Sequence, residues 1–125
     1  MAARVLTGIY DQELRCTGML ATQFALLAIL EQRPGAAQDQ LTAWMAMEQS
    51  TLSRNLQGLI RKRWVSRAPA SGSRRVGYET TAPGRTALKR ARPGWQRAQS
   101  RIKRALGADW RGLGRLLQKV SALAG

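Results

Sequence analysis

Apolar residues recur at three- and four-residue steps along much of the chain, which predicts a mostly helical protein. The first helical segment runs from Ala3 to about Arg15 and ends at Gly18, because glycine readily takes the left-handed conformation that follows a helix. A second helix opens at Thr22, whose hydroxyl would accept hydrogen bonds from the first free amides. Residues 24–30 of this helix are apolar nearly all round, so we expect it at the centre of the core.

Two further helical segments follow, separated by a short turn. The first spans residues 37–46, and the turn occupies residues 47–50, with Ala46 as the small residue that such a turn requires. The second begins at Gln49 or Ser50 and runs to about Trp64. Its inward positions are apolar and its other positions are polar, which is typical of a helix that shows one face to solvent. The inward residues are Leu52, Leu56, Leu59 and Ile60.

The next part of the chain changes from a helical to a strand pattern. Residues 65–68 and 76–80 have β-branched and aromatic content, and the segment between them is rich in Ser, Gly and Arg. This pattern predicts a hairpin with a mobile basic tip. Thr81 then caps a long helix over about 83–106, with a bend expected at Pro93 because a proline ring disrupts helical packing.

An apolar stripe continues from the long helix through a last helix to the C-terminus. The stripe is too long to be filled by the core of one 125-residue chain, so we predict that it is shared with a second copy, together with the first helix. The residues of this predicted dimer contact are Val5, Ile9, Ile102, Leu106, Trp110, Leu113, Leu116, Leu117, Val120 and Leu123.

Composition restricts the function more than the fold. The chain has 21 Lys and Arg against 7 Asp and Glu, a net charge of +14, which favours a polyanionic partner. It has no histidine and a single cysteine, Cys16, so we expect no metal, no cofactor, no disulfide and no His-dependent catalysis. No apolar run reaches the roughly eighteen residues that a membrane span needs, and no signal peptide is recognisable. We therefore expect a cytoplasmic protein of one domain.

The paired helices at residues 37–64 are typical of a DNA-reading helix-turn-helix. A recognition helix enters the major groove by its N-terminal end, where short hydroxyl side chains approach bases and phosphates without clash. Arg54 and Gln57 lie one turn further on and can reach base edges. Basic residues at the hairpin tip suit the negative potential of a minor groove. The predicted DNA-binding residues are Gln49, Ser50, Thr51, Ser53, Arg54, Gln57, Arg61, Arg74 and Arg75.

Five segments together resemble the multiple-antibiotic-resistance regulator (MarR) family of winged helix-turn-helix regulators. The resemblance covers almost the whole chain, in order, and it lies in residues 20–27 (LATQFALL), 50–56 (STLSRNL), 59–65 (LIRKRWV), 73–76 (SRRV) and 80–85 (TTAPGR). It implies a mostly α fold with a small β-hairpin wing, and a dimer formed through the N- and C-terminal helices. Residues of about 1–17 and 83–125 would then form the dimerisation helices, and about 22–82 the DNA-binding part.

The resemblance also implies roles for single residues, and the chain departs from the family pattern in two places. Ser50, Thr51, Ser53 and Arg54 match the DNA-reading positions of the family, and Arg74 and Arg75 match its wing arginines. Wings of the family usually carry an aspartate just before the arginine, which stiffens the tip. Here residues 71–73 are Ser, Gly and Ser, so the resemblance does not imply a rigid wing. The first helix also begins almost at Met1, so we expect part of the family's dimerisation arm to be short.

Effector recognition has weaker candidates. Some members of this family sense oxidants through a cysteine of the first helix, and Arg15 would favour the thiolate of Cys16; a lone cysteine is otherwise commonly a small buried apolar residue. Trp44 and Tyr10 are candidates for lining an effector cavity, and packing is the alternative for the aromatic residues Trp95 and Trp110.

The sequence thus predicts a homodimeric transcriptional regulator that binds double-stranded DNA at a pseudo-palindromic operator. We expect a repressor released by a small molecule or an oxidant. One alternative is a nonspecific architectural or nucleoid protein, which would bind DNA with a salt dependence but little sequence preference. A second alternative, an enzyme, finds no support, because no paired acids, metal cluster or glycine-rich nucleotide loop are present.

Overall fold

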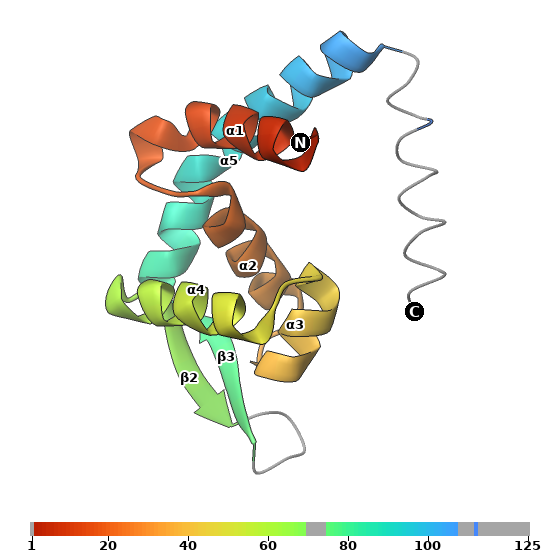
Figure 1. Ribbon diagram of the computed structural model, residues 1–125. Helices are drawn as coiled ribbons and strands as arrows, with labels where there is room; N and C mark the ends of the chain where they lie inside the picture. The colour runs from red at the N-terminus through yellow and green to blue at the C-terminus, as the bar shows by residue number, and fades with distance from the viewer. Residues whose placement is uncertain (1, 70–74, 108–111, 113–125) are drawn as a thin grey trace.

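Helices make up most of the structure, and a small antiparallel sheet lies beside them (Figure 1). The computed structural model describes residues 2–69, 75–107 and Gly112. The sheet has the strand order β1-β3-β2, and β2 and β3 form the predicted hairpin. The elements in chain order are α1 (Ala2–Leu14), the 3-10 turn η1 (Arg15–Thr17), α2 (Ala21–Gln32), β1 (Ala36–Ala37), α3 (Gln38–Met45), α4 (Gln49–Arg61), β2 (Val65–Pro69), β3 (Val76–Thr80) and α5 (Ala82–Leu106).

The core is built around α2, as its uniformly apolar sequence predicted. Leu26, Leu27 and Leu30 of this helix are almost completely buried. They belong to one apolar cluster that α1, α3, α4, β2 and α5 all join, through residues such as Leu14, Leu41, Leu56, Val65 and Leu88. Burial of this kind, rather than helix propensity, stabilises short helices. The hairpin and the far end of α5 lie at opposite ends of the molecule (Figure 1).

The start of α2 differs from the prediction. Helix α2 begins at Ala21, and the hydroxyl of Thr22 does not cap it. Instead, the Asp11 carboxylate of α1 accepts a hydrogen bond from the Ala21 amide at 2.7 Å, and the Gln23 side chain accepts one from the Leu20 amide at 2.9 Å. Both bonds satisfy amides that a helix start leaves free. The prediction of Thr22 as the cap was wrong because the main acceptor comes from another helix.

Helices α1 and α5 cross in close contact at a glycine. A Cβ atom built on Gly94 would lie 2.6 Å from the Glu13 carbonyl oxygen and 3.3 Å from Leu14, so only glycine allows this approach. The chain continues as one helix through Pro93. Next to the crossing, the Glu13 carboxylate accepts hydrogen bonds from Arg97 at 3.0 Å and from Arg101 at 3.2 Å. The same carboxylate therefore ties both arginines to the end of α1.

This tie gives the contact between α1 and α5 a pH dependence. Hydrogen bonding from Arg97 is the main cause that lowers the pKa of Glu13, partly opposed by desolvation and assisted by Arg101. Because the pKa of Glu13 is lower in the folded than in the unfolded chain, the ionised carboxylate stabilises the fold at pH values above 4.5, its ordinary pKa. This stabilisation is lost as the pH falls through the pKa of the folded state. We expect Glu13→Gln to lower the melting temperature slightly at pH 7, and this effect to shrink as the pH falls below 4.5, as measured by circular dichroism.

The matched control for Glu13→Gln is Glu79→Gln, which removes a carboxylate from an exposed position on β3. An equal loss of stability in the two variants at neutral pH would contradict a specific role for Glu13. A difference between Glu13→Gln and wild type that persists unchanged in acid would contradict the proposed ion pairing as its cause.

Tyr10 is partly buried and packs against the core. The centroid of its ring lies 4.1 Å from that of Trp95. The ring of Phe24 also stacks on Trp95, with 4.2 Å between the centroids. Offset and tilted aromatic pairs of this kind add to the stabilisation that comes from burial alone. Trp95 therefore packs against the core, as one of its two interpretations predicted, and the contribution of Tyr10 to an effector cavity stays a prediction.

The residues predicted to form a dimer divide into three groups. Ile102 is only 2% exposed within one chain, so it needs no second chain for its burial, contrary to the prediction. Val5 is 62% exposed, and Ile9 and Leu106 are partly exposed, so these three leave apolar surface uncovered. The remaining predicted contacts, Trp110, Leu113, Leu116, Leu117, Val120 and Leu123, lie outside the described residues.

Among the described residues, no single helix is long and apolar enough to cross a membrane. Residues Arg4–Thr17 and Ala21–Gln32 reach the required length and composition only as a pair, with a bend of 81° between them.

Candidate nucleic-acid interface

The turn between α3 and α4 is held by backbone hydrogen bonds. Ala46 ends α3 in a left-handed conformation with φ of 50°, as suits a small residue at this position, and the Met47 amide donates to the Thr42 carbonyl oxygen at 3.3 Å. The Gln38 side chain donates to the Gln49 carbonyl oxygen at 3.4 Å. These bonds fix the first turn of α4 relative to α3, which is the geometry of a helix-turn-helix.

Helix α4 starts where the sequence predicted and ends earlier. It begins at Gln49 but stops at Arg61 rather than at Trp64. The reason is backbone conformation: Arg63 has φ of 64°, and its amide donates to Ile60 at 2.9 Å, so the chain turns away from the helix axis. This turn brings Trp64 to the start of β2 and lets it pack against the core.

The two faces of α4 are sharply different. Leu52, Leu56 and Leu59 are at most 1% exposed and face the core. On the opposite side, the spacing of four, three and four residues places a polar stripe along one line of the helix. The stripe consists of Ser50, Arg54, Gln57 and Arg61, all of which are exposed. The sequence-predicted residues Thr51 and Ser53 lie on its two flanks and are partly exposed, and Gln49 is exposed at the helix start.

Few intramolecular contacts occupy these polar side chains. The guanidinium of Arg54 lies 3.5 Å from the Thr51 hydroxyl, at the limit of a hydrogen bond. Asn55 donates to the Thr51 carbonyl oxygen at 2.9 Å, and its amide lies 3.8 Å from the Met47 sulfur. Asn55 thus braces the first turn of α4 against the turn before it, and the hydroxyl and guanidinium groups of the stripe stay available to an external partner.

The hairpin projects beside α4 as a wing (Figure 1). Val65 of β2 pairs with Thr80 of β3, and the register continues to Pro69 and Val76. Arg75 immediately precedes β3 and is exposed. It forms an ion pair with Asp39 in the first turn of α3. The wing tip, including Arg74, lies outside the described residues.

Two residues near the wing were missed by the sequence reasoning. Arg67 of β2 is exposed and lines a groove of about 270 Å³ together with Arg75, Pro69 and Val76. Asp39 contributes a carboxylate close to this groove through its ion pair with Arg75. The alternation of side chains along a strand could not have pointed to Arg67, because Arg67 lies two residues after the buried Val65 and therefore on the same face of β2. Nothing local in the sequence pairs Asp39 with Arg75, because the two come from different elements.

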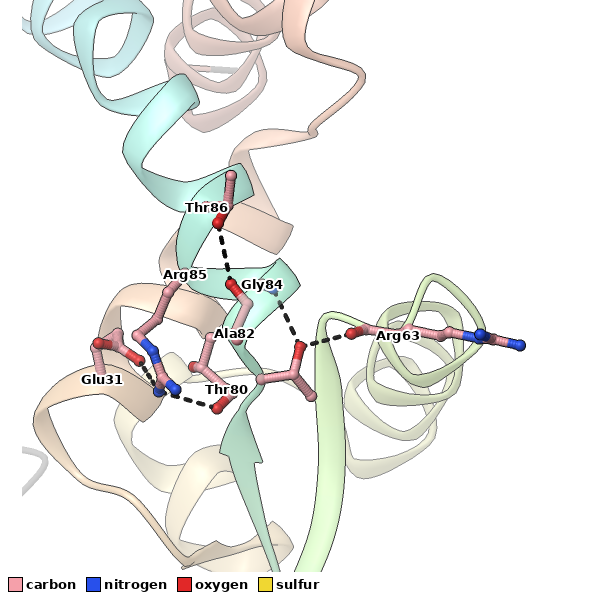
Figure 2. A network of polar contacts seen from close by, with 8 residues as sticks. Glu31, Arg63, Thr80, Ala82, Gly84, Arg85 and Thr86 are labelled. Carbon is pink, nitrogen blue, oxygen red and sulfur yellow. Dashed lines mark hydrogen bonds and ion pairs between the residues drawn. The ribbon is translucent and has the colours of Figure 1, made fainter.

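A polar junction joins α4, the wing and α5. Figure 2 shows the carbonyl oxygen of Arg63 and the amide of Gly84 converging on one hydroxyl. That hydroxyl belongs to Thr81, which donates to the Arg63 oxygen at 2.5 Å and accepts from the Gly84 amide at 3.0 Å. The prediction that Thr81 caps the long helix is therefore confirmed. Arg85 in turn donates to Glu31 at 3.4 Å and to the Thr80 carbonyl oxygen at 3.2 Å (Figure 2).

The predicted effector residues Cys16, Trp44 and Tyr10 belong to three different elements, η1, α3 and α1. Cys16 is exposed on the turn η1, which contradicts its interpretation as a small buried residue. Trp44 is 45% exposed, and the Arg33 guanidinium lies 5.3 Å from its ring centre. One surface groove of about 450 Å³ lies between Glu13 and the arginines of α5. This groove is not lined by Cys16, Trp44 or Tyr10.

The described residues contain no group of three or more His, Cys, Asp or Glu side chains that could hold a metal ion. The arrangement offers hydroxyl, amide and guanidinium donors on an exposed helix and a neighbouring basic hairpin. Donors of these types read base edges in a major groove and bind backbone phosphates.

Comparison with known proteins supports this interpretation. A family model described as the MarR family matches residues 17–76. The chain is 33% identical to the M. tuberculosis transcriptional regulator MosR, solved in complex with DNA, over 98% of this chain and 90% of that one, with a TM-score of 0.84. No curated protein sequence gives a match.

The fold is shared more widely than the sequence. A cysteine-to-serine mutant of MarR from E. coli, complexed with operator DNA, is 23% identical, with a TM-score of 0.82. That comparison covers 94% of this chain and 86% of the E. coli chain. The family and the fold are those of transcriptional regulators and not of enzymes. The chain therefore belongs to the MarR family of winged helix-turn-helix proteins and is a DNA-binding transcriptional regulator.

Proposed function

We propose that the protein is a sequence-specific repressor that binds a pseudo-palindromic operator as a homodimer. The observation that carries this proposal is the exposed stripe of Ser50, Arg54, Gln57 and Arg61 on a helix whose opposite face is buried. Such a helix can enter a major groove without disturbing the core. The wing beside it would place Arg67, Arg74 and Arg75 against flanking phosphates or a minor groove.

Dimerisation would follow from the apolar surface that one chain leaves uncovered. Val5 is 62% exposed on α1, and Ile9 and Leu106 are partly exposed. A twofold dimer through α1, the end of α5 and the C-terminal residues would cover this surface. It would also set two reading helices about one turn of DNA apart, which is the reason to expect an operator with two related halves.

Release by an effector is the third part of the proposal. The distance between the two recognition helices of a dimer differs between its conformations. An effector that binds better to a conformation in which this distance does not fit DNA would shift the population of dimers away from the DNA-binding arrangement. Trp44, exposed beneath Arg33, is the proposed contact for a small molecule, and the exposed Cys16 is the proposed target of an oxidant. An operator affinity that stays constant when the purified protein meets organic hydroperoxide would contradict the role of Cys16.

Selection of duplexes from a random pool by the full-length protein tests the operator. We expect the enriched duplexes to share two inverted half-sites whose centres lie about ten base pairs apart, or a multiple of that spacing. Enrichment of no shared sequence would contradict sequence-specific binding and favour the architectural alternative. Enrichment of a single, unrepeated half-site would contradict binding as a twofold dimer.

A further inference from the structure

An ion pair joins the base of the wing to α3. Asp39 is in the first turn of α3, and its carboxylate forms an ion pair with the Arg75 guanidinium. Both side chains are more than half exposed, at 57% and 58%. Arg75 is therefore held by a partner that leaves it within reach of solvent and of any larger anion.

The sheet brings these two residues together. Strand β1 runs antiparallel to β3, with Ala36 opposite Tyr78 and Ala37 opposite Gly77. Two positions further along, the same antiparallel course takes the chain from Ala37 to Asp39 and from Gly77 back to Arg75. The pairing of β1 with β3 thus places the first turn of α3 against the base of the wing, which explains how an exposed pair can have a defined geometry.

The chemistry of the pair resembles that of a guanidinium bound to a phosphate. A carboxylate and a phosphate each present two oxygen atoms that can accept hydrogen bonds from the N–H groups of one guanidinium. The hydrogen bond to Arg75 is the main cause that lowers the pKa of Asp39, so the carboxylate is ionised at neutral pH. The same contact raises the pKa of Arg75.

We propose that the Asp39 carboxylate occupies the place of a DNA phosphate at Arg75 in the free protein and must release this guanidinium when the wing meets DNA. Asp39 is then an internal competitor that lowers affinity for DNA of any sequence. Asp39 does not affect the preference of the protein among DNA sequences, because the contact it competes with is to a phosphate and carries no sequence information. That preference is set by the side chains of α4. This inference rests on the proposed contact of the wing with DNA, and it assigns to α3 a role in setting the strength of that contact.

A double-mutant cycle tests the competition. The proteins are wild type, Asp39→Asn, Arg75→Gln and the double variant, each titrated against one labelled random-sequence duplex at fixed low salt. We expect Asp39→Asn to bind on the order of twofold to fivefold more tightly than wild type, since exposed ion pairs are weak, and Arg75→Gln to bind more weakly. In the Arg75→Gln background the gain from Asp39→Asn should disappear.

Glu79→Gln is the matched control for the loss of a negative charge near DNA, because Glu79 is exposed on the same strand that Arg75 precedes. An equal gain from Asp39→Asn and Glu79→Gln, or an equal gain from Asp39→Asn in both backgrounds, would overturn the proposal in favour of general repulsion. Weaker binding by Asp39→Asn would also overturn it, because Asp39 would then position Arg75 for DNA. Melting temperatures of all the variants confirm that each is folded.

The inference and the proposed function fail in different ways. If wild type binds the duplex and Arg75→Gln binds equally well, the wing contact and the competition are both wrong while the reading helix is untouched. If wild type binds no duplex DNA even at low salt, the proposed function fails and the inference fails with it.

Discussion

Replacing Gly84 by alanine is expected to destabilise the protein by about 1–3 kcal/mol or more, the range seen when atoms are forced into a filled site. A Cβ atom on Gly84 would lie 2.1 Å from the Trp64 carbonyl oxygen and 2.8 Å from the Thr80 methyl carbon. The Trp64 oxygen cannot move freely, because it already accepts a hydrogen bond from the Thr81 amide at 2.9 Å. Urea denaturation followed by circular dichroism measures the change in the free energy of unfolding.

The matched control is Gly58→Ala in α4. A Cβ atom on Gly58 would meet nothing within 4 Å, and alanine is favoured over glycine inside a helix by about 0.5–1 kcal/mol. The same chemical change is thus expected to stabilise at Gly58 and to destabilise at Gly84. A Gly84→Ala protein as stable as wild type would contradict the tight junction between the wing and α5.

Arg54→Ala is expected to have the largest effect on DNA binding. Arg54 is exposed at the centre of the polar stripe of α4, and its guanidinium lies 3.5 Å from the Thr51 hydroxyl, a contact too long to hold it firmly. Removing an arginine that reads a base edge weakens binding by about 1–3 kcal/mol and relaxes sequence preference at that base. We expect a loss of operator affinity of about tenfold to a hundredfold, measured by fluorescence anisotropy on the selected operator.

The effect on nonspecific binding separates base reading from simple charge. For a scrambled duplex, Arg54→Ala should lose much less affinity than for the operator, so the ratio of the two affinities falls. Arg92→Ala on the exposed face of α5 removes the same charge and should leave that ratio unchanged. A fall in affinity for operator and scrambled duplex by the same factor in Arg54→Ala would show that Arg54 contacts phosphate only.

Patterns that repeat locally were predictable from the sequence. The apolar run of α2, the alternation of Leu52, Leu56 and Leu59 with polar residues, and the cap at Thr81 all follow from neighbours within a few residues. Those features fix the helix-turn-helix and the hairpin, because side chains three or four residues apart share one face of a helix. The polar stripe that forms the candidate site followed from the same rule.

Features that depend on contacts between distant segments were not predictable. The carboxylate that caps α2 belongs to Asp11 in another helix. Strand β1 consists of two alanines, and it forms because its backbone pairs with the edge of β3. Neither has a signal in its own sequence. The burial of Ile102 and the ion pair of Asp39 with Arg75 likewise depend on which elements pack together. The site was therefore predictable on α4 and only partly so at the wing.

The central claim is that α4 and the wing make this chain a sequence-specific DNA-binding protein. The most direct measurement is the affinity of the full-length protein for its selected operator and for a scrambled duplex, each titrated over a range of salt concentrations. Specific binding predicts an operator affinity at least about a thousandfold higher than the scrambled one at physiological salt. Equal affinities for the two duplexes, with the same steep salt dependence, would contradict the claim and identify a nonspecific DNA-binding protein.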